Sequence, residues 1–576
     1  MKHTLGALLA MLTLAVNGAA LGATLAGNVN GPTGQRIAGA LVTVTDKQRG
    51  LGESVYSDAT GRFSLKTQLS GTLALRVRAP YFNDLSRTLE LPPDGEIRET
   101  LILQSMTSPE EISDSLPAAY HFADLPFEEG TPFGRSKFQR DCISCHQLGN
   151  SITRAPRPAE AWEVTVRRMH GYLGNADDSL AAARSQILAH GFDGKRTALR
   201  PKFPFDPMIT RAKIVQYRLD KAEVPHDAEV SPDDGLVYTV DQFAEQMAIT
   251  NLETGQTDYV PMPEEGSPVG GKFATLGMPL LFNRPLHRGP HSLAIGTDGK
   301  WYTTDSIADR IGVFDPHKRQ WDKSFEIGGK SLYPHTIRFD RTGHAWFTLA
   351  YSEQVGRLDP KTGQVDVVDL PANRSTGASS GSVPYGIDVH PGDGTIWYSR
   401  LFSDKVGRID PDTLEVVEYD SPVKGPRRMR FGRDGTLWLT GFSEGTLARV
   451  DTRGFKAKVY RMPEFAPGCR PAPYALAVHP ETQEIWINEV MTDRVYRFLP
   501  KRERFVAYPM PLRGTYTRDM SFTKDGRVCT SNNPFPQAAL EGGTMELICI
   551  DPEGGGEAAL IASPARTTRE ALLRTR

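Results

Sequence analysis

A short motif of cysteine and histidine carries the strongest chemical signal in the sequence. It reads Cys142-Ile143-Ser144-Cys145-His146. The two thiols lie about one helical turn apart, which is the spacing of a C-x-x-C-H haem attachment sequence. Both thiols can form thioethers with one haem, and the adjacent imidazole is then held beneath the iron as its proximal ligand. The motif therefore predicts haem c, with Cys142 and Cys145 as attachment residues and His146 as a ligand of the haem iron.

Three other interpretations of this motif were weighed. A structural zinc site needs about four ligands, and the remaining cysteines lie far downstream in the chain. A thioredoxin-like dithiol needs a βαβ setting, which the flanking sequence lacks. A plain disulfide leaves His146 unexplained. The haem interpretation accounts for all three residues and is preferred.

The second axial ligand of the iron is expected on the helical stretch that follows. Trp162, Val166 and Met169 recur at helical spacing and therefore share one face. That face is either packed core or the distal side of a haem, where a methionine thioether raises the reduction potential and suits electron transfer. Met169 is the first candidate for this iron ligand, ahead of His170 and then His190.

The elements that must position this chemistry include an internal repeat from about residue 210 onward. Five of the seven tryptophans recur every ~40–50 residues, the period of propeller blades. They are Trp301, Trp346, Trp397, Trp438 and Trp486. Seven short segments with similar sequences recur at about the same interval, and each is expected to begin a blade; we call them blade openings. The strand-like segment 214–218 precedes the first opening as 459–462 precedes the sixth. We expect a seven-bladed β-propeller over 210–562, in which the segment 214–218 completes the last blade and removes its open edge.

The blade openings define a second candidate site. They begin the innermost strands, so equivalent residues should converge at one end of the channel. These residues are His226, His291, His335, Tyr385, Arg427, Tyr474 and Arg518. The segments after the Trp-x-Thr units are expected to reach the same face with Asp241, Asp305, Arg400, Glu489 and Asn532. Such convergence indicates a binding site, and His226, His291 and His335 could hold a second metal ion, such as copper, iron or zinc. The alternative is a solvated ring of hydrogen-bonded side chains.

The remainder of the chain divides by composition. Residues 1–23 have the basic start, short apolar run and small residues of a secretory signal peptide, so a periplasmic or secreted location is expected. Short alternating strands predict a β-sandwich over 24–104, a Pro- and Ser-rich linker spans 105–132, a helical domain spans 133–205, and 563–576 form a tail. The fold class is therefore mainly β, with a small sandwich, a small α-helical domain and a propeller.

Charge and the remaining cysteines set further limits. The 67 basic and 69 acidic residues give a net charge of −2, which argues against a nucleic-acid partner. No second long apolar stretch follows the signal peptide, so no membrane span is expected. Cys529 and Cys549 lie on strands expected to be neighbours, and in an oxidising compartment they either pair or remain two buried thiols. Cys469 is left single.

Three resemblances to known families follow from these motifs. Gly134 and Phe138 ahead of Cys142 resemble the first helix of class I cytochromes c. The Pro-His and Pro-Tyr openings, with 346–348 and 355–359, resemble the virginiamycin B lyase propeller family. The segments 38–40 and 57–63 resemble the carboxypeptidase regulatory-like domain, whose members are usually spacers or docking modules. These resemblances imply a cytochrome domain fused to both.

The lyase resemblance also implies a chemistry. In that family a histidine acts as general base beside a Mg²⁺-stabilised carbonyl, within a Glu-x-His element. Glu489 matches the glutamate, but Met491 holds the place of the histidine, which removes the base that elimination requires. His291, His335 and Glu489 are the candidate catalytic residues if this propeller is an enzyme.

Three functions are consistent with the sequence. The first is an exported redox protein whose haem exchanges electrons with a redox partner protein, while the propeller binds a small molecule or a metal. The second is a C–O lyase or hydrolase with an accessory cytochrome. The third is a non-enzymatic electron carrier. The substrate, the electron donor or acceptor and the oligomeric state are not predictable from the sequence.

Overall fold

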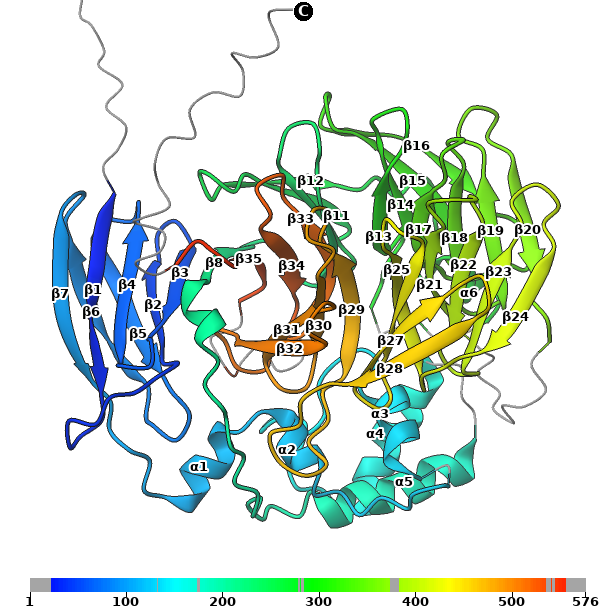
Figure 1. Cartoon of the computed structure of the whole chain (residues 1–576). Helices are drawn as coiled ribbons and strands as arrows, with labels where there is room; N and C mark the ends of the chain where they lie inside the picture. The colour runs from blue at the N-terminus through cyan, green and yellow to red at the C-terminus, as the bar shows by residue number, and fades with distance from the viewer. Residues whose placement is uncertain are drawn as a thin grey trace, which may run out of the picture.

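The computed structural model describes residues 22–131, 133–172, 177–277, 280, 284–372, 383–534, 540 and 544–555. The expected signal peptide, apart from its last two residues, and the expected tail lie outside these ranges. A β-sandwich lies beside a propeller, and a group of helices lies across one end of the propeller (Figure 1). None of the helices in the described ranges combines the length and apolarity that a bilayer crossing requires.

Six of the propeller sheets are continuous in sequence and antiparallel, with the first strand of each innermost. The first blade holds β9 (Pro225–Val230), β10 (Val237–Asp241), β11 (Gln246–Thr250) and β12 (Thr257–Pro261), and the second holds β13 (Pro290–Ile295), β14 (Trp301–Asp305), β15 (Arg310–Asp315) and β16 (Gln320–Glu326). The third holds β17 (Pro334–Phe339), β18 (Ala345–Leu349), β19 (Gln354–Leu358) and β20 (Val365–Asp369), and the fourth holds β21 (Pro384–Val389), β22 (Ile396–Arg400), β23 (Lys405–Ile409) and β24 (Val416–Asp420). The fifth holds β25 (Pro426–Phe431), β26 (Thr436–Gly441), β27 (Thr446–Asp451) and β28 (Lys456–Arg461), and the sixth holds β29 (Pro473–Val478), β30 (Ile485–Glu489), β31 (Arg494–Leu499) and β32 (Arg504–Pro509).

The seventh blade closes the ring. It consists of β33 (Thr517–Phe522), β34 (Val528–Asn532), β35 (Glu546–Asp551) and, from the other end of the repeat, β8 (Lys213–Arg218). The predicted clasp is therefore confirmed, because β8 pairs antiparallel with β35 along its whole length. At the inner side of this blade β33 packs against β9, and the amide of Val230 donates to the Ser521 hydroxyl at 3.0 Å.

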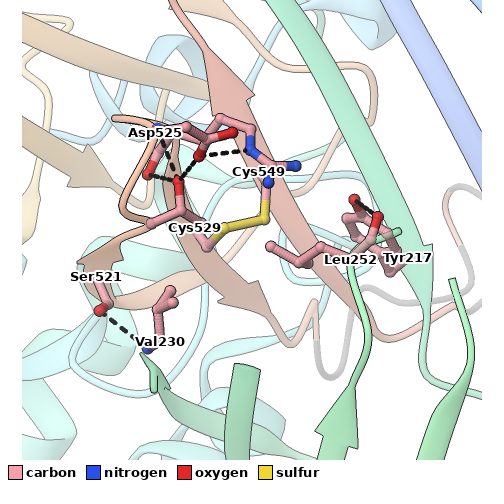
Figure 2. The surroundings of a disulfide bond; sticks show 9 residues. Tyr217, Val230, Leu252, Ser521, Asp525, Cys529 and Cys549 are labelled. Carbon is pink, nitrogen blue, oxygen red and sulfur yellow. Dashed lines mark hydrogen bonds and ion pairs between the residues drawn. A yellow bond between two sulfur atoms is a disulfide. The ribbon is translucent and has the colours of Figure 1, made fainter. Parts of the chain in front are cut away.

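A disulfide ties the middle of the seventh blade. Cys529 and Cys549 lie directly opposite each other on β34 and β35, with a Cα–Cα distance of 4.1 Å, and their sulfurs are bonded (Figure 2). Of the two alternatives that the sequence left open, the structure has the disulfide. Cys469 is a buried free thiol.

The periodic tryptophans explain why the repeat folds as blades. All five are buried, with at most 4 % of each residue exposed, and each lies on the second strand of its sheet. Trp346, for example, packs with Ile387, Ile396 and Tyr398 of the next blade. Burial of one such indole contributes several kcal/mol, since truncation of a core Trp costs about 3–5 kcal/mol. The spacing read from the sequence is therefore the spacing of inter-blade contacts.

The N-terminal sandwich is joined to the propeller through a shared sheet. One layer holds β1 (Ala23–Asn30), β4 (Arg62–Thr67) and β7 (Glu96–Ile102); the other holds β2 (Leu41–Asp46), β3 (Leu51–Tyr56), β5 (Gly71–Arg78) and β6 (Leu85–Leu91). Strand β3 pairs antiparallel with β8, so one eight-stranded sheet runs from β33 to β6. Leu65 and Val77 of the sandwich share a core with Tyr217 and Leu547 of the seventh blade.

The helices differ from the expected separate cytochrome domain. They are α1 (Pro109–Ser115), α2 (Ala118–Phe122), α3 (Arg135–Cys142), α4 (Ala159–Tyr172), α5 (Asp178–Gly191), the 3-10 helix η1 (Pro207–Arg211) and, within the propeller, α6 (Gly271–Thr275). A separate α-helical domain is not evident, because α2 to α5 share one core with the propeller residues Tyr474, Met491 and Tyr516. The expected linker also departs from prediction: α2 is buried, and the Ala119 amide donates to the Met491 carbonyl oxygen at 2.9 Å.

Candidate functional site

A cavity of ≈ 530 Å³ lies between the helices and the end of the propeller. Its walls come from the C-x-x-C-H segment, from helix α4 and from the loops and inner strands of several blades. Cys142, Cys145 and His146 line it together with His226, His291, His335, Tyr385, Arg427, Tyr474 and Arg518. The two candidate sites predicted separately from the sequence thus border one space.

The two cysteines of the motif are free thiols at the end of α3. Cys142 is the last residue of the helix and is half-buried, whereas Cys145 is exposed toward the cavity. Burial raises the pKa of the Cys142 thiol to about 12 and raises that of Cys145 as well. Reactive dithiols of the thioredoxin kind carry a cysteine with a lowered pKa, so these thiols do not fit that chemistry. Nor are they joined in a disulfide.

His146 presents one ring nitrogen for coordination. Its Nδ1 lies 2.8 Å from the Gln147 carbonyl oxygen, which can only accept, so Nδ1 carries the proton. Nε2 then keeps its lone pair. Burial lowers the pKa of His146, which favours the neutral imidazole. A hydrogen bond of this kind on the far nitrogen fixes the tautomer and orientation of metal-binding histidines.

The propeller holds the C-x-x-C-H segment through its backbone. Arg427 donates to the Ser144 carbonyl oxygen at 3.0 Å, and Arg518 donates to that of Cys145 at 3.3 Å. Both arginines were predicted to converge on a binding site, and their guanidinium groups contact the C-x-x-C-H segment and stack on tyrosines. The Arg427 guanidinium carbon lies 3.9 Å from the Tyr474 ring centroid. Blades five and seven therefore fix the position of the motif.

Tyr474 and Tyr385 complete this contact. Their hydroxyls lie 3.0 Å apart, Arg518 donates to Tyr474 at 2.9 Å, and Arg427 donates to Tyr385 at 2.5 Å. Burial opposes ionisation of Tyr474, but the nearby guanidinium groups of Arg518 and Arg427 lower its pKa overall. This arginine and tyrosine cluster places positive charge next to the C-x-x-C-H segment.

The three histidines, one from each of the first three blades, lie in a row with tilted rings, which we call the histidine stack, and His335 at its end packs against Tyr385 with ring centroids 3.9 Å apart. The ring centroids of His226 and His291 are 3.7 Å apart, and those of His291 and His335 are 4.1 Å apart. Burial lowers the pKa of His226 to about 4 and holds those of His291 and His335 well below their ordinary value. All three are therefore uncharged at neutral pH. Within the described ranges, no group of three or more His, Cys, Asp or Glu side chains is arranged to hold a metal ion.

Helix α4 forms part of the cavity wall, and Trp162 and Val166 also belong to the core shared with the propeller. Trp162, Val166 and Met169 all line the cavity, and Met169 is half-buried. His170 also borders the cavity, but its Nε2 accepts a hydrogen bond from Arg184 at 2.9 Å, and burial lowers its pKa to about 4. His190 is exposed and does not line the cavity.

The five residues expected after the tryptophan strands do not line the cavity. They stabilise the blades instead. Glu489 accepts from the amides of Met491 and Thr492, both at 2.8 Å, and Asp241 accepts from that of Val224 at 2.9 Å. The remaining contacts of this set are Asp305 with Arg288, Arg400 with Glu418, and Asn532 with the Tyr516 amide.

Other cavity residues were not predicted. Tyr333 and Gln242 line the histidine side, and the Gln242 amide donates to the Tyr333 hydroxyl at 3.2 Å. Tyr351 donates to the Tyr172 carbonyl oxygen at 2.6 Å and so joins a propeller loop to the end of α4. Tyr333 was within reach of sequence reasoning, because it directly precedes the Pro334-His335 opening. Tyr351 and Gln242 carry no comparable signal.

The fold and the cavity define a seven-bladed propeller protein whose axis is covered at one end by helices. The virginiamycin B lyase family matches residues 282–469 and 378–537, and the carboxypeptidase regulatory-like domain matches residues 24–104. The chain thus contains a virginiamycin B lyase-like propeller and a carboxypeptidase regulatory-like domain.

The chain is also similar to individual proteins. A virginiamycin B lyase of Nocardia farcinica (strain IFM 10152) is 32% identical over 114 residues, which cover 19% of this chain and 35% of that protein, about a third of its length. A streptogramin B lyase structure covers 59% of this chain and 97% of its own, with 19% identity and a TM-score of 0.48. A virginiamycin B lyase structure from Staphylococcus aureus covers 59% and 99%, with 18% identity and a TM-score of 0.47.

Proposed function

We propose that this protein is an exported haem c protein that exchanges electrons with a small molecule bound on the propeller side of the cavity. Cys142 and Cys145 would hold the haem through thioethers, and His146 would bind its iron. One observation carries the proposal: these three residues border the same cavity as the histidine stack of the propeller. A small molecule in this cavity would lie beside the electron carrier without a partner to bridge them.

The residues present fit a c-type haem. Two unpaired thiols and an imidazole with a free Nε2 supply both covalent attachment and iron ligation. The walls around them are largely apolar, as a porphyrin requires, with Trp162, Val166, Leu148 and Leu188 among them. Met169 borders the same space and is our candidate for a second residue that would bind the iron. Bound haem would supply one-electron chemistry.

The propeller side of the cavity is suited to orienting a small molecule. His226, His291 and His335 stay uncharged at neutral pH and offer ring nitrogens, while Tyr333 offers a hydroxyl. A few fixed polar groups in a mostly apolar cavity are typical of small-molecule sites. A redox partner protein would complete the electron path.

A spectroscopic experiment tests the proposal. The protein should be expressed with a working haem-attachment system and exported. We expect c-type absorption bands that survive denaturation, and we expect Cys142→Ser with Cys145→Ser to abolish the covalent attachment. Met169→Leu should shift the spectrum and lower the reduction potential, because it removes the thioether. A colourless mature protein would refute the proposal. Elemental analysis of the same sample tests for a second metal.

A C–O lyase or hydrolase is the second candidate. The match of the propeller to the virginiamycin B lyase family favours it. Glu489 has its carboxylate bound to backbone amides and Met491 replaces the expected histidine, so this activity would need a different base. Ester or lactone cleavage without an electron acceptor, lost in His291→Ala, would support this candidate over the redox function.

A further inference from the structure

Two arginines lie on one wall of the cavity. Arg157 lies in the loop before α4 and is half-buried, and Arg168 lies on α4 and is exposed. Both line the cavity, as does Thr165 between them. The sequence analysis did not identify these residues as site residues. They also take no part in the contacts that hold the C-x-x-C-H segment against the propeller.

The local geometry brings the two guanidinium groups to the same wall. The Arg157 guanidinium carbon lies 4.8 Å from the Trp162 ring centroid, and its Nη1 lies 3.5 Å from the Thr165 hydroxyl. Thr165 and Arg168 are three residues apart on the helix and therefore neighbours on its surface. Arg157 is thus held against the face of α4 from which Arg168 projects.

The charges around the cavity are unbalanced. Among the described residues that line it, Asp141 is the one carboxylate, and Asp141 is already paired with Arg184 and Arg140, both at 2.6 Å. No ion pair involves Arg157 or Arg168 within the described part of the chain. Arg167, by contrast, does not line the cavity and forms ion pairs with Glu163, at 2.6 Å, and with Asp178.

We propose that Arg157 and Arg168 form a carboxylate-binding site on the α4 wall of the cavity. The forked donors of a guanidinium group match the two oxygens of a carboxylate. The inference rests on the proposed function for its first source of carboxylates, the two propionates of a haem attached at Cys142 and Cys145. A small free carboxylate presents the same chemistry, and the experiment separates the two sources.

The test uses the full chain with Cys142→Ser and Cys145→Ser, in which haem binds without thioethers and its affinity is measurable. Haem and its dimethyl ester, which lacks free carboxylates, are titrated separately and followed by absorption. We expect haem to bind roughly tenfold more tightly than the ester, as one or two charge-assisted hydrogen bonds would give. Arg157→Gln with Arg168→Gln should remove this preference by weakening haem binding alone. Arg167→Gln on the same helix should leave it intact.

The second arm titrates the haem-free protein with acetate and succinate by calorimetry. Carboxylate binding that needs both Arg157 and Arg168, without a preference for haem over its ester, would support the site with a free ligand as its source. Equal binding of haem and ester, together with no binding of acetate or succinate, would overturn the inference. If the wild-type protein never acquires haem, the proposed function is refuted. The titration with succinate then still tests whether Arg157 and Arg168 bind a carboxylate.

Discussion

The phenolic hydroxyl of Tyr516 donates a hydrogen bond to the carbonyl oxygen of Ile143 at 2.8 Å. Tyr516 directly precedes the inner strand of the seventh blade, and Ile143 is the C-cap of helix α3, inside the C-x-x-C-H motif. Both residues are fully buried. The propeller and the C-x-x-C-H segment therefore meet at a contact that excludes water.

Removal of this hydroxyl should destabilise the protein. In Tyr516→Phe the buried carbonyl of Ile143 loses its partner, and an unsatisfied buried acceptor costs about 1–3 kcal/mol. The free energy of unfolding, measured with denaturant, should fall by that amount. Tyr120→Phe is the matched control, because Tyr120 belongs to the same core and its buried hydroxyl has no hydrogen-bond partner among the residues that the structure describes. An equal loss in both variants would contradict the assigned role of the Tyr516 hydrogen bond.

The fold was largely predictable where its signals are periodic. The tryptophans mark inter-blade contacts, and the similarity between 214–218 and 459–462 predicted the clasp because every blade repeats the same strand pattern. The union of β3 with β8 was not predictable. It depends on a pairing such as Glu53 opposite Val215, between strands with no sequence signal for each other. The shared core of α2 to α5 with the propeller has the same non-local origin.

The sequence predicted many of the residues that line the cavity, but not how these residues are arranged in it. Equivalent positions such as His226 and Arg427 do converge, because each begins an inner strand. Their roles differ, because the helices cover one side of the ring and bring Ser144 and Cys145 into reach of the arginines. Asp241 and Glu489 were misplaced in the prediction. A carboxylate at a strand end can bond the adjacent turn, and that local bond turns it away from the channel.

Loss of the disulfide should weaken the seventh blade. Cys529 and Cys549 are separated by 20 residues, and closing a loop of that size contributes about 3 kcal/mol. Cys529→Ser with Cys549→Ser should therefore lower the free energy of unfolding by about this amount, and reduction of the wild-type protein should have a similar effect. Cys469→Ala, at the buried free thiol, should respond to oxidant and reductant as the wild type does. Unfolding that is insensitive to reductant in the wild type would argue against the pairing in solution.

The histidine stack should make stability depend on pH. The folded protein holds the pKa of His226 at about 4, below its ordinary value of 6.5, because of burial and the nearby Arg518. As the pH falls from 6.5 toward 4, the unfolded chain takes up the proton first, so stability is retained above pH 6.5 and lost below it. The slope is at most about 1.4 kcal/mol per pH unit for each such histidine.

Substitution within the stack tests this assignment. Unfolding of His226→Gln, followed with denaturant at several pH values from 7 to 4, should show a shallower loss of stability than the wild type. His190→Gln, at the exposed histidine on α5, should follow the wild-type curve. A His226→Gln curve that runs parallel to the wild type would mean that this imidazole does not stay neutral in the folded state.

The propeller should depend on the N-terminal sandwich for its stability. Strand β8 pairs with β35 on one side and β3 on the other, and Lys213 forms an ion pair with Glu53 at 2.8 Å across the second pairing. Deletion of residues 24–104 would expose the backbone donors and acceptors of β8 as an open edge, together with the apolar side chain of Tyr217 that now lies in the shared core. We expect the truncated protein to unfold at a lower temperature and to aggregate, as measured by calorimetry and light scattering. A spacer domain would predict the opposite: a soluble propeller with an unchanged melting temperature. Lys213→Gln serves as the milder comparison, because it removes the ion pair and keeps the strand covered, so the melting temperature should fall less than in the truncated protein and the variant should not aggregate.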